Sequence, residues 1–162
     1  MKEDIIKRSG YIALGSRLIR VGEQLRAESQ KIIDKHDIQI QGYQHFLLVA
    51  MVENGPLTIG DLAEVVGVSQ PGVTRSIGQL KKQGYVEIQL SETDKRMRIV
   101  ALTPLGHKVY QEAKDVTWPQ IDYCLTQLLA GQNGPFMEQL DHLEKALDDG
   151  SLIAQLMERR DG

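Results

Sequence analysis

Between positions 57 and 103 the residue pattern changes from a helical period to a strand period, and this change constrains the fold more than any other feature of the chain. Two short helices come first, joined by a turn at Gly67, and the second helix ends at Gly84. Two runs of alternating polar and apolar residues then flank the polar segment SETDKR. This order of two helices, a tight turn and a hairpin with a charged tip predicts a winged helix-turn-helix.

Capping residues mark the start of both helices. Thr58 and Asp61 supply a short capping box for the first helix. Ser69 is expected to cap the second helix. Because Pro71 has no N–H, the Ser69 hydroxyl is expected to accept a hydrogen bond from the amide of Gly72.

The helix pair has the residues that a steep crossing requires. Ala63 is the small residue at the crossing, and apolar residues face inward at Leu62, Val66, Val68, Val73 and Ile77. The outward face of the second helix carries mainly short polar groups at the end that would meet a major groove: Ser69, Gln70, Pro71, Thr74, Arg75 and Gly78. The pattern therefore predicts a DNA-reading helix, and the alternative is a helical hairpin with no nucleic-acid role.

The flanking segments predict longer helices. Apolar residues at spacings of three and four run from Tyr11 to Ile32, and a more apolar helix is expected over Tyr43 to Glu53. Thr103 followed by proline begins a long helix, in which Pro119 predicts a kink or break. A last helix begins at Pro135.

The apolar stripes on these flanking helices are longer than a small core can cover, so a second subunit is expected. We therefore divide the chain into an N-terminal dimerisation helix (1–36), a winged helix-turn-helix (41–103) and C-terminal helices that complete the dimerisation region (104–162). The expected fold class is mainly α with a small β-hairpin wing.

The formal net charge of −3 hides an uneven distribution. Positions 69–98 hold six Lys or Arg against three acidic residues, an excess of +3, whereas positions 135–162 hold seven acidic residues against three basic ones. Because attraction to phosphate is local and is screened within about 10 Å, the acidic total does not exclude DNA binding.

Other protein classes lack support in the sequence. There is no N-terminal apolar region of the signal-peptide kind and no apolar run close to the roughly 20 residues that span a bilayer. We expect a cytoplasmic protein with no membrane partner. The chain has no P-loop, G-x-G-x-x-G, H-E-x-x-H or G-x-S-x-G motif, and its four histidines are scattered. We therefore expect no enzymatic activity, no cofactor and no metal site.

Two short motifs complete the pattern. The wing carries Asp94, Lys95 and Arg96, and the segment LTPLG occupies positions 102–106. Together with the helix pair and the flanking helices, these residues resemble the MarR family of transcriptional regulators over nearly the whole chain. The resemblance implies a homodimer that binds double-stranded DNA, a pseudo-palindromic operator, and a repressor that a small, often aromatic or phenolic, ligand releases from DNA.

The resemblance and the residue chemistry together suggest roles in DNA binding. Gln suits adenine, Arg suits guanine and the Thr methyl suits thymine, whereas other basic and hydroxyl groups position phosphates. The candidates are Ser69, Gln70, Pro71, Thr74, Arg75, Lys82, Lys95, Arg96 and Arg98. Arg96 resembles the wing arginine that enters the minor groove, and Asp94 either supports it or is a plain turn residue.

The ligand expectation names five residues that could line a pocket, with ordinary core packing as the alternative for each. They are Tyr11, Tyr43, His45, Met51 and Trp118. Two other functions stay open: a winged-helix adaptor that binds protein, and a redox-sensing regulator of the same fold. The second would depend on Cys124, which the helical pattern places on an apolar face beside Leu125.

Overall fold

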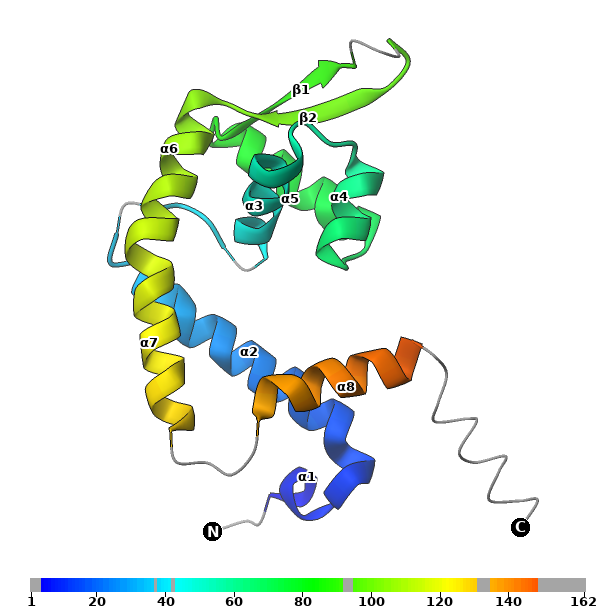
Figure 1. Cartoon of the computed structure of the whole chain (residues 1–162), viewed down its shortest axis with the longest axis vertical. Helices are drawn as coiled ribbons and strands as arrows, with labels where there is room; N and C mark the ends of the chain where they lie inside the picture. Colours follow the sequence, from blue (N-terminus) through cyan, green and yellow to red (C-terminus); the bar gives the residue numbers. More distant parts are fainter. Residues whose placement is uncertain (1–3, 37, 42, 92–94, 131–134, 149–162) are drawn as a thin grey trace, which may run out of the picture. The chain divides into compact units, whose positions relative to one another are not determined.

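The computed structural model describes residues 4–36, 38–41, 43–91, 95–130 and 135–148 (Figure 1). The chain divides into two compact units, Met1–Leu125 and Thr126–Gly162. Helices predominate, and a two-stranded antiparallel hairpin is the sheet of the first unit. The expected fold class, mainly α with a β-hairpin wing, is confirmed.

The N-terminal region is helical but not continuous. It comprises α1 (Ile5–Arg8), a 3₁₀ turn (Gly10–Ala13) and α2 (Leu14–Ile33). The expectation of regular helix from Tyr11 is wrong at its start, because Gly10 takes φ +60° and the chain turns there. An ion pair of 2.9 Å between Arg20 and Asp4 ties α2 back to the start of α1.

The helix pair lies where the sequence predicts it. After α3 (Gln44–Asn54) come α4 (Ile59–Val66) and α5 (Gln70–Lys82). The capping box of α4 is confirmed: the Asp61 amide donates to Thr58 Oγ1 at 3.1 Å, and the Thr58 amide donates to Asp61 Oδ2 at 3.2 Å. Gly67 takes the left-handed conformation, φ +68°, that ends α4.

One capping prediction is wrong. Ser69 precedes α5 with extended backbone, but its side chain makes no capping hydrogen bond. Its hydroxyl lies beside Gly72, 3.3 Å from where a Cβ would stand, without accepting from the Gly72 amide. The first turn of α5 therefore has no side-chain cap.

The wing is an antiparallel hairpin of β1 (Val86–Leu90) and β2 (Arg98–Leu102), in which Val86 pairs with Leu102. Leu57 pairs with β2 through an isolated antiparallel bridge to Val100. The Leu57 amide donates to the Val100 carbonyl at 3.1 Å, and the Val100 amide donates to the Leu57 carbonyl at 2.7 Å. A one-residue bridge has no sequence period, so the pattern did not predict it.

The start of α6 (Pro104–Glu112) is fastened to the end of α5. Thr103 Oγ1 accepts from the Gly106 amide at 3.0 Å and donates to the Gly84 carbonyl at 2.6 Å. A Cβ on Gly106 would stand 2.0 Å from the Tyr85 carbonyl oxygen, so only glycine fits there. In the LTPLG motif, the threonine therefore caps α6, and the glycine leaves room for the Tyr85 carbonyl.

The expected disturbance at Pro119 lies before that residue. A π-helical turn, Ala113–Thr117, separates α6 from α7 (Trp118–Leu129), and Pro119 is the second residue of α7. Proline has no N–H to donate and its ring crowds the carbonyl four residues earlier, so a wider turn at that point accommodates it. Thr117 is fully buried and its hydroxyl donates to the Ala113 carbonyl at 3.1 Å.

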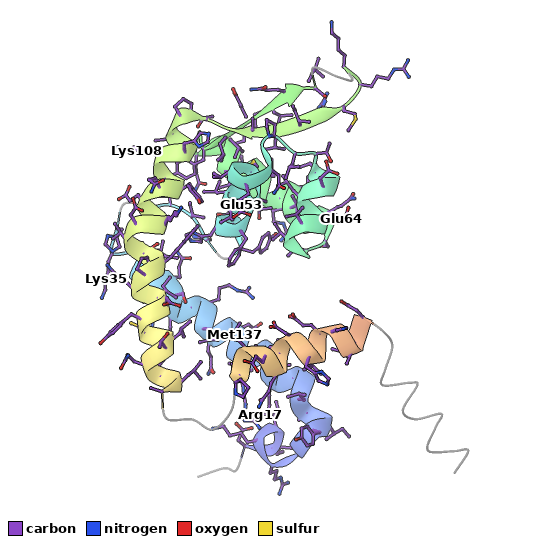
Figure 2. The ribbon with its side chains drawn as sticks, viewed as in Figure 1. Arg17, Lys35, Glu53, Glu64, Lys108 and Met137 are labelled. Carbon is purple, nitrogen blue, oxygen red and sulfur yellow. The ribbon has the colours of Figure 1, made fainter. Side chains whose placement is uncertain are left out.

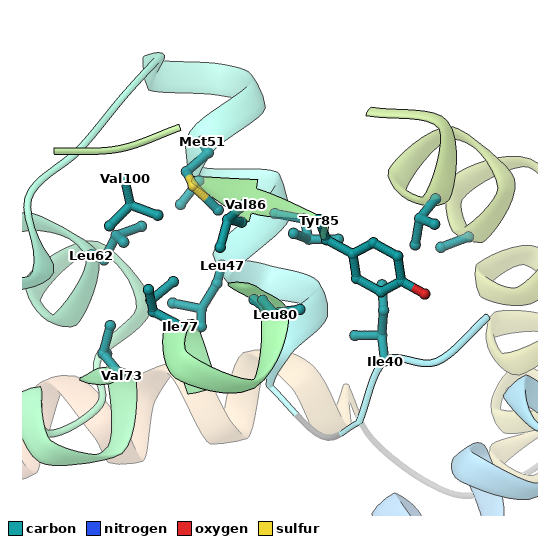
Figure 3. Close-up of a cluster of buried hydrophobic side chains, with 14 of the residues drawn as sticks. Ile40, Leu47, Met51, Leu62, Val73, Ile77, Leu80, Tyr85, Val86 and Val100 are labelled. Carbon is teal, nitrogen blue, oxygen red and sulfur yellow. The ribbon is translucent and has the colours of Figure 1, made fainter. Parts of the chain in front are cut away.

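One core joins α3, α4, α5, the wing and α6 (Figure 3). The predicted inner residues Leu62, Val73 and Ile77 are 0–1% exposed, and Val66 and Val68 pack against them partly buried. The end of α2 and the loop after it contribute further apolar side chains, Ile33, Ile38 and Ile40. This core holds α5 with its opposite face outward.

Several helices leave apolar side chains exposed. On α2 these are Leu18, Ile19, Val21 and Leu25. In the second unit, α8 (Phe136–Asp148) exposes Phe136, Met137 and Leu147, and Met137 is labelled in Figure 2. No helix among the described residues is long and apolar enough to cross a membrane.

Candidate nucleic-acid interface and ligand cavity

The outward face of α5 presents the residues that the sequence assigned to DNA. Ser69, Gln70, Pro71, Thr74, Arg75, Gly78 and Lys82 are all exposed. Val73, Ile77 and Leu80 hold the opposite face in the core. The Thr74 hydroxyl donates to the Gln70 carbonyl at 2.9 Å, so its proton is used within the helix. Arg75 and Lys82 form no ion pair with any described residue, and their charges face solvent.

The N-terminus of α5 is open to an anion. Ser69 provides no side-chain cap, and Pro71 contributes no N–H, so the amides of Gln70 and Gly72 are first-turn donors without a side-chain acceptor. The helix dipole adds partial positive charge at the same end. Unsatisfied first-turn amides of this kind suit a phosphate oxygen.

The wing adds positive charge at its tip. Lys95, Arg96 and Arg98 are exposed, and Arg98 is the first residue of β2. Asp94, the expected support for the wing arginine, lies outside the described residues. The hairpin and the face of α5 belong to one core, so the wing and the reading face are held by the same packing.

A cavity of about 530 Å³ lies within the first unit, between α2, the start of α3 and α7. Its walls are mainly apolar, and they include Ile33, Tyr43, His45, Phe46, Trp118 and Ile121. Arg26 of α2 and Asp122 of α7 supply charged groups to the lining. The combination of a large apolar wall and few polar groups is typical of a small-molecule site.

His45 and Trp118 form the polar pair of this cavity. Trp118 Nε1 donates to His45 Nδ1 at 3.2 Å, and the two rings meet edge to face with centroids 6.1 Å apart. Burial lowers the pKa of His45 from 6.5 to about 4, so the imidazole is neutral at pH 7. Since Nδ1 accepts, the proton lies on Nε2, which is buried and has no hydrogen-bond partner among the described residues.

The structure separates the five residues proposed for ligand contact. Tyr43, His45 and Trp118 line the cavity. Tyr11 does not, because it lies in the 3₁₀ turn with 92% of its surface exposed. Met51 is 4% exposed and belongs to the core around α5. Helical periodicity predicts which face is apolar but not which neighbouring element covers it, and this explains both differences.

Some lining residues were absent from the sequence prediction. Arg26, Phe46 and Ile121 line the cavity, although no motif or spacing marks them. Phe46 is 61% exposed, so it is not an ordinary core residue of α3. Cys124 is exposed on α7, whereas its neighbour Leu125 lines the cavity. Among the described residues, no three His, Cys, Asp or Glu side chains gather as a metal site would require.

Comparison with known proteins places the chain in a family. The MarR family model matches residues 36–97. The transcriptional regulator FarR of Neisseria gonorrhoeae is 30% identical over 105 residues, which are 65% of this chain and 70% of FarR. The transcriptional repressor MprA of Escherichia coli (strain K12) is 29% identical over 115 residues, 68% of this chain. The match spans 63% of the length of MprA.

A solved structure extends the likeness to most of the fold. The chain resembles BpsR of Bordetella bronchiseptica, whose DNA binding is regulated by 6-hydroxynicotinic acid, with a TM-score of 0.66 and 22% identity. The match covers 92% of this chain and 99% of BpsR. The winged helix, the sequence match to FarR and the family model agree, and the chain belongs to the MarR family of transcriptional regulators.

Proposed function

We propose that this chain is a homodimeric, sequence-specific DNA-binding repressor that a small aromatic ligand releases from a pseudo-palindromic operator. The observation that carries the proposal is the exposed face of α5. It combines hydrogen-bonding side chains with an uncapped helix N-terminus, and the wing of the same core carries exposed positive charge. A regulator of this kind works where the DNA is, in the cytoplasm.

The residue roles follow from side-chain chemistry. Gln70 has the amide that pairs with adenine, Arg75 has the fork that pairs with guanine, and the Thr74 methyl suits thymine. Ser69 and Lys82 position phosphates, together with the open first-turn amides of α5. On the wing, Arg96 enters the minor groove, and Lys95 and Arg98 contact phosphate. Asp94 supports Arg96.

A second subunit accounts for the apolar side chains left exposed by the flanking helices. Leu18, Val21 and Leu25 repeat along α2 at spacings of three and four, and they are 37–42% exposed. The N-terminal and C-terminal helices thus form the dimerisation region in this proposal. Two-fold symmetry then places the two reading helices in half-sites about 34 Å apart.

The cavity supports the ligand part of the proposal. BpsR responds to an aromatic acid, and the cavity of this chain offers apolar walls for a ring. His45 lines the cavity, and its buried Nε2–H has no acceptor among the described residues, so a small shift of the ring would give a ligand one donor. Release from DNA requires the ligand to prefer an arrangement of the two reading helices that does not fit the operator.

The decisive experiment is selection of duplexes from a random-sequence DNA pool, followed by mobility-shift titration at several salt concentrations. We expect a pseudo-palindromic consensus and an affinity that falls steeply with salt. Failure to enrich any duplex would favour a protein-binding adaptor and overturn the proposal. Aromatic acids, including 6-hydroxynicotinic acid, are then tested for release of the selected duplex. If none of these compounds releases it, the ligand part fails while the DNA-binding part stands.

A further inference from the structure

Three residues between α2 and the start of α3, Gln39, Tyr43 and Gln44, are hydrogen-bonded to α5 or to its C-cap residue Gln83. Gln83 Nε2 donates to the Gln39 carbonyl at 2.6 Å. Gln44 Nε2 donates to Gln79 Oε1 at 2.6 Å. Ser76 Oγ donates to the Tyr43 hydroxyl at 3.1 Å. We call this row of contacts the polar seam.

The polar seam lies on one face of α5 and its C-terminal end. Ser76, Gln79 and Gln83 are spaced by three and four residues, which places them in one row, and Gly72 extends the row by one turn. At 3.6 residues per turn, Thr74 falls on nearly the opposite side of α5, whereas Arg75, four residues before Gln79, borders the row. The seam therefore runs along one edge of the surface proposed to read DNA.

The Tyr43 hydroxyl lies in close contact with α5 at Gly72 and Ser76. A Cβ on Gly72 would stand 2.9 Å from the Tyr43 hydroxyl oxygen, closer than real Cβ contacts come. Ser76, which donates to the same hydroxyl, is only 6% exposed. Because the tyrosine ring is rigid and the contact is close, a displacement of the ring must either move α5 or break the contact.

The same tyrosine lines the cavity. Tyr43 contributes to its wall together with His45 and Phe46, which follow it at the start of α3. One residue thus lines the proposed ligand site and contacts the proposed reading helix through its hydroxyl. Gln44, the next residue, is 4% exposed and makes the second contact of the seam.

We propose that the polar seam couples the cavity to the reading helix, with Tyr43 as the positioning residue. The inference rests on the proposed function, since it assigns a route by which occupancy of the cavity reaches α5. Coupling between two sites is reciprocal, so DNA bound at α5 must also change the cavity. This reciprocity allows the seam to be tested without knowing the ligand.

Trp118 is the single tryptophan of the chain, and it lines the cavity. Its fluorescence therefore reports the cavity without a label. The experiment adds saturating amounts of the selected duplex to the full-length protein and measures the change in Trp118 emission relative to the free protein. Saturation removes any difference in DNA affinity between variants from the comparison.

The test variant is Tyr43→Phe, which removes the hydroxyl that contacts Ser76 and keeps the aromatic ring. Tyr123→Phe is the matched control, because it removes the same atom from a side chain that is 65% exposed on α7. Gln79→Met is a second variant, made at the exposed partner of Gln44. Circular dichroism melting checks that each variant is folded.

We expect duplex binding to change Trp118 emission in the wild type and in Tyr123→Phe. The change should be smaller by about threefold or more in Tyr43→Phe and in Gln79→Met. If duplex binding leaves the Trp118 emission of the wild type unchanged, or if both seam variants respond as the wild type does, the proposed coupling through the seam is wrong. The proposal of DNA binding would still stand. If no duplex binds the wild type, the proposed function itself fails, and the seam proposal fails with it.

Discussion

Trp118 Nε1 lies 3.2 Å from His45 Nδ1, and this hydrogen bond determines which nitrogen of the buried imidazole carries the proton. The donor on Trp118 requires an unprotonated acceptor, so His45 is neutral with its proton on Nε2. The hydrogen bond thus holds a neutral imidazole in a buried place, and this has a consequence for the stability of the protein at low pH.

Acidification should destabilise the protein through His45. Its pKa is lowered from 6.5 to about 4 in the folded state, so the unfolded chain takes up the proton first as pH falls. The contribution is present above pH 6.5, and it decreases between pH 6.5 and 4, by about 3 kcal/mol at most. Urea unfolding at a series of pH values measures this loss.

The comparison variant is His45→Gln, which does not titrate. Carboxyl groups contribute equally to both proteins, so the difference between the two pH profiles isolates the histidine. The wild type should lose more stability than the variant between pH 6.5 and 4.5. Parallel profiles would show that His45 is not buried as a neutral group.

Gly106→Ala should destabilise the wing and the start of α6. The added methyl would meet the Tyr85 carbonyl oxygen at 2.0 Å, and backbone on both sides prevents a small adjustment. We expect a loss of about 1–3 kcal/mol or more in the free energy of unfolding, measured by urea denaturation. A stability equal to wild type would mean that α6 does not approach Tyr85 this closely.

Two glycines within α5 should respond in opposite directions to alanine. No heavy atom lies within 4 Å of the position that a methyl on Gly78 would take, so Gly78→Ala should raise stability by about 0.5–1 kcal/mol through helix propensity. Gly72→Ala should lower it by about 1–2 kcal/mol, because the methyl meets the Tyr43 hydroxyl. Thermal melting of the two variants tests both predictions. Melting temperatures that shift equally and in the same direction would contradict them.

Arg96→Ala should weaken DNA binding and reduce its salt dependence. If the wing tip meets the phosphate backbone or the minor groove, one cation fewer lowers the slope of log affinity against log salt by about one unit. Lys35→Ala is the charge-matched control, since Lys35 is exposed just beyond α2 and has no assigned role in binding. Equal slopes for both variants would remove Arg96 from the interface.

The helix pair was predictable because its signals are local. A threonine and an aspartate three residues apart cap α4, a glycine ends it, and apolar residues recur at the helical period. The change of period after Gly84 predicted the hairpin in the same way. Each of these signals acts between residues that are close in sequence, so no knowledge of distant contacts was needed.

Two local predictions were wrong, the Ser69 cap and the regular helix from Tyr11, and the others that differed from the structure concerned contacts between distant segments. Tyr11 and Met51 have the apolar character of pocket residues, but one is exposed and the other is in the core. The bridge between Leu57 and Val100 also had no local signal. Pro119 did predict a disturbance of its helix, but not that it would be a π-helical turn before the proline.

By itself, the sequence determined the order of helices and strands, the exposed face of α5 and the charged wing, because periodicity, capping and turn residues act over a few positions. Only the tertiary structure decided that Tyr43 lines the cavity and contacts α5, that the donor of His45 has no partner among the described residues, and that Gly106 permits a backbone contact. These properties depend on which side chains from distant segments meet, and on the space left between them. Packing decides both, and residue pattern alone does not encode either.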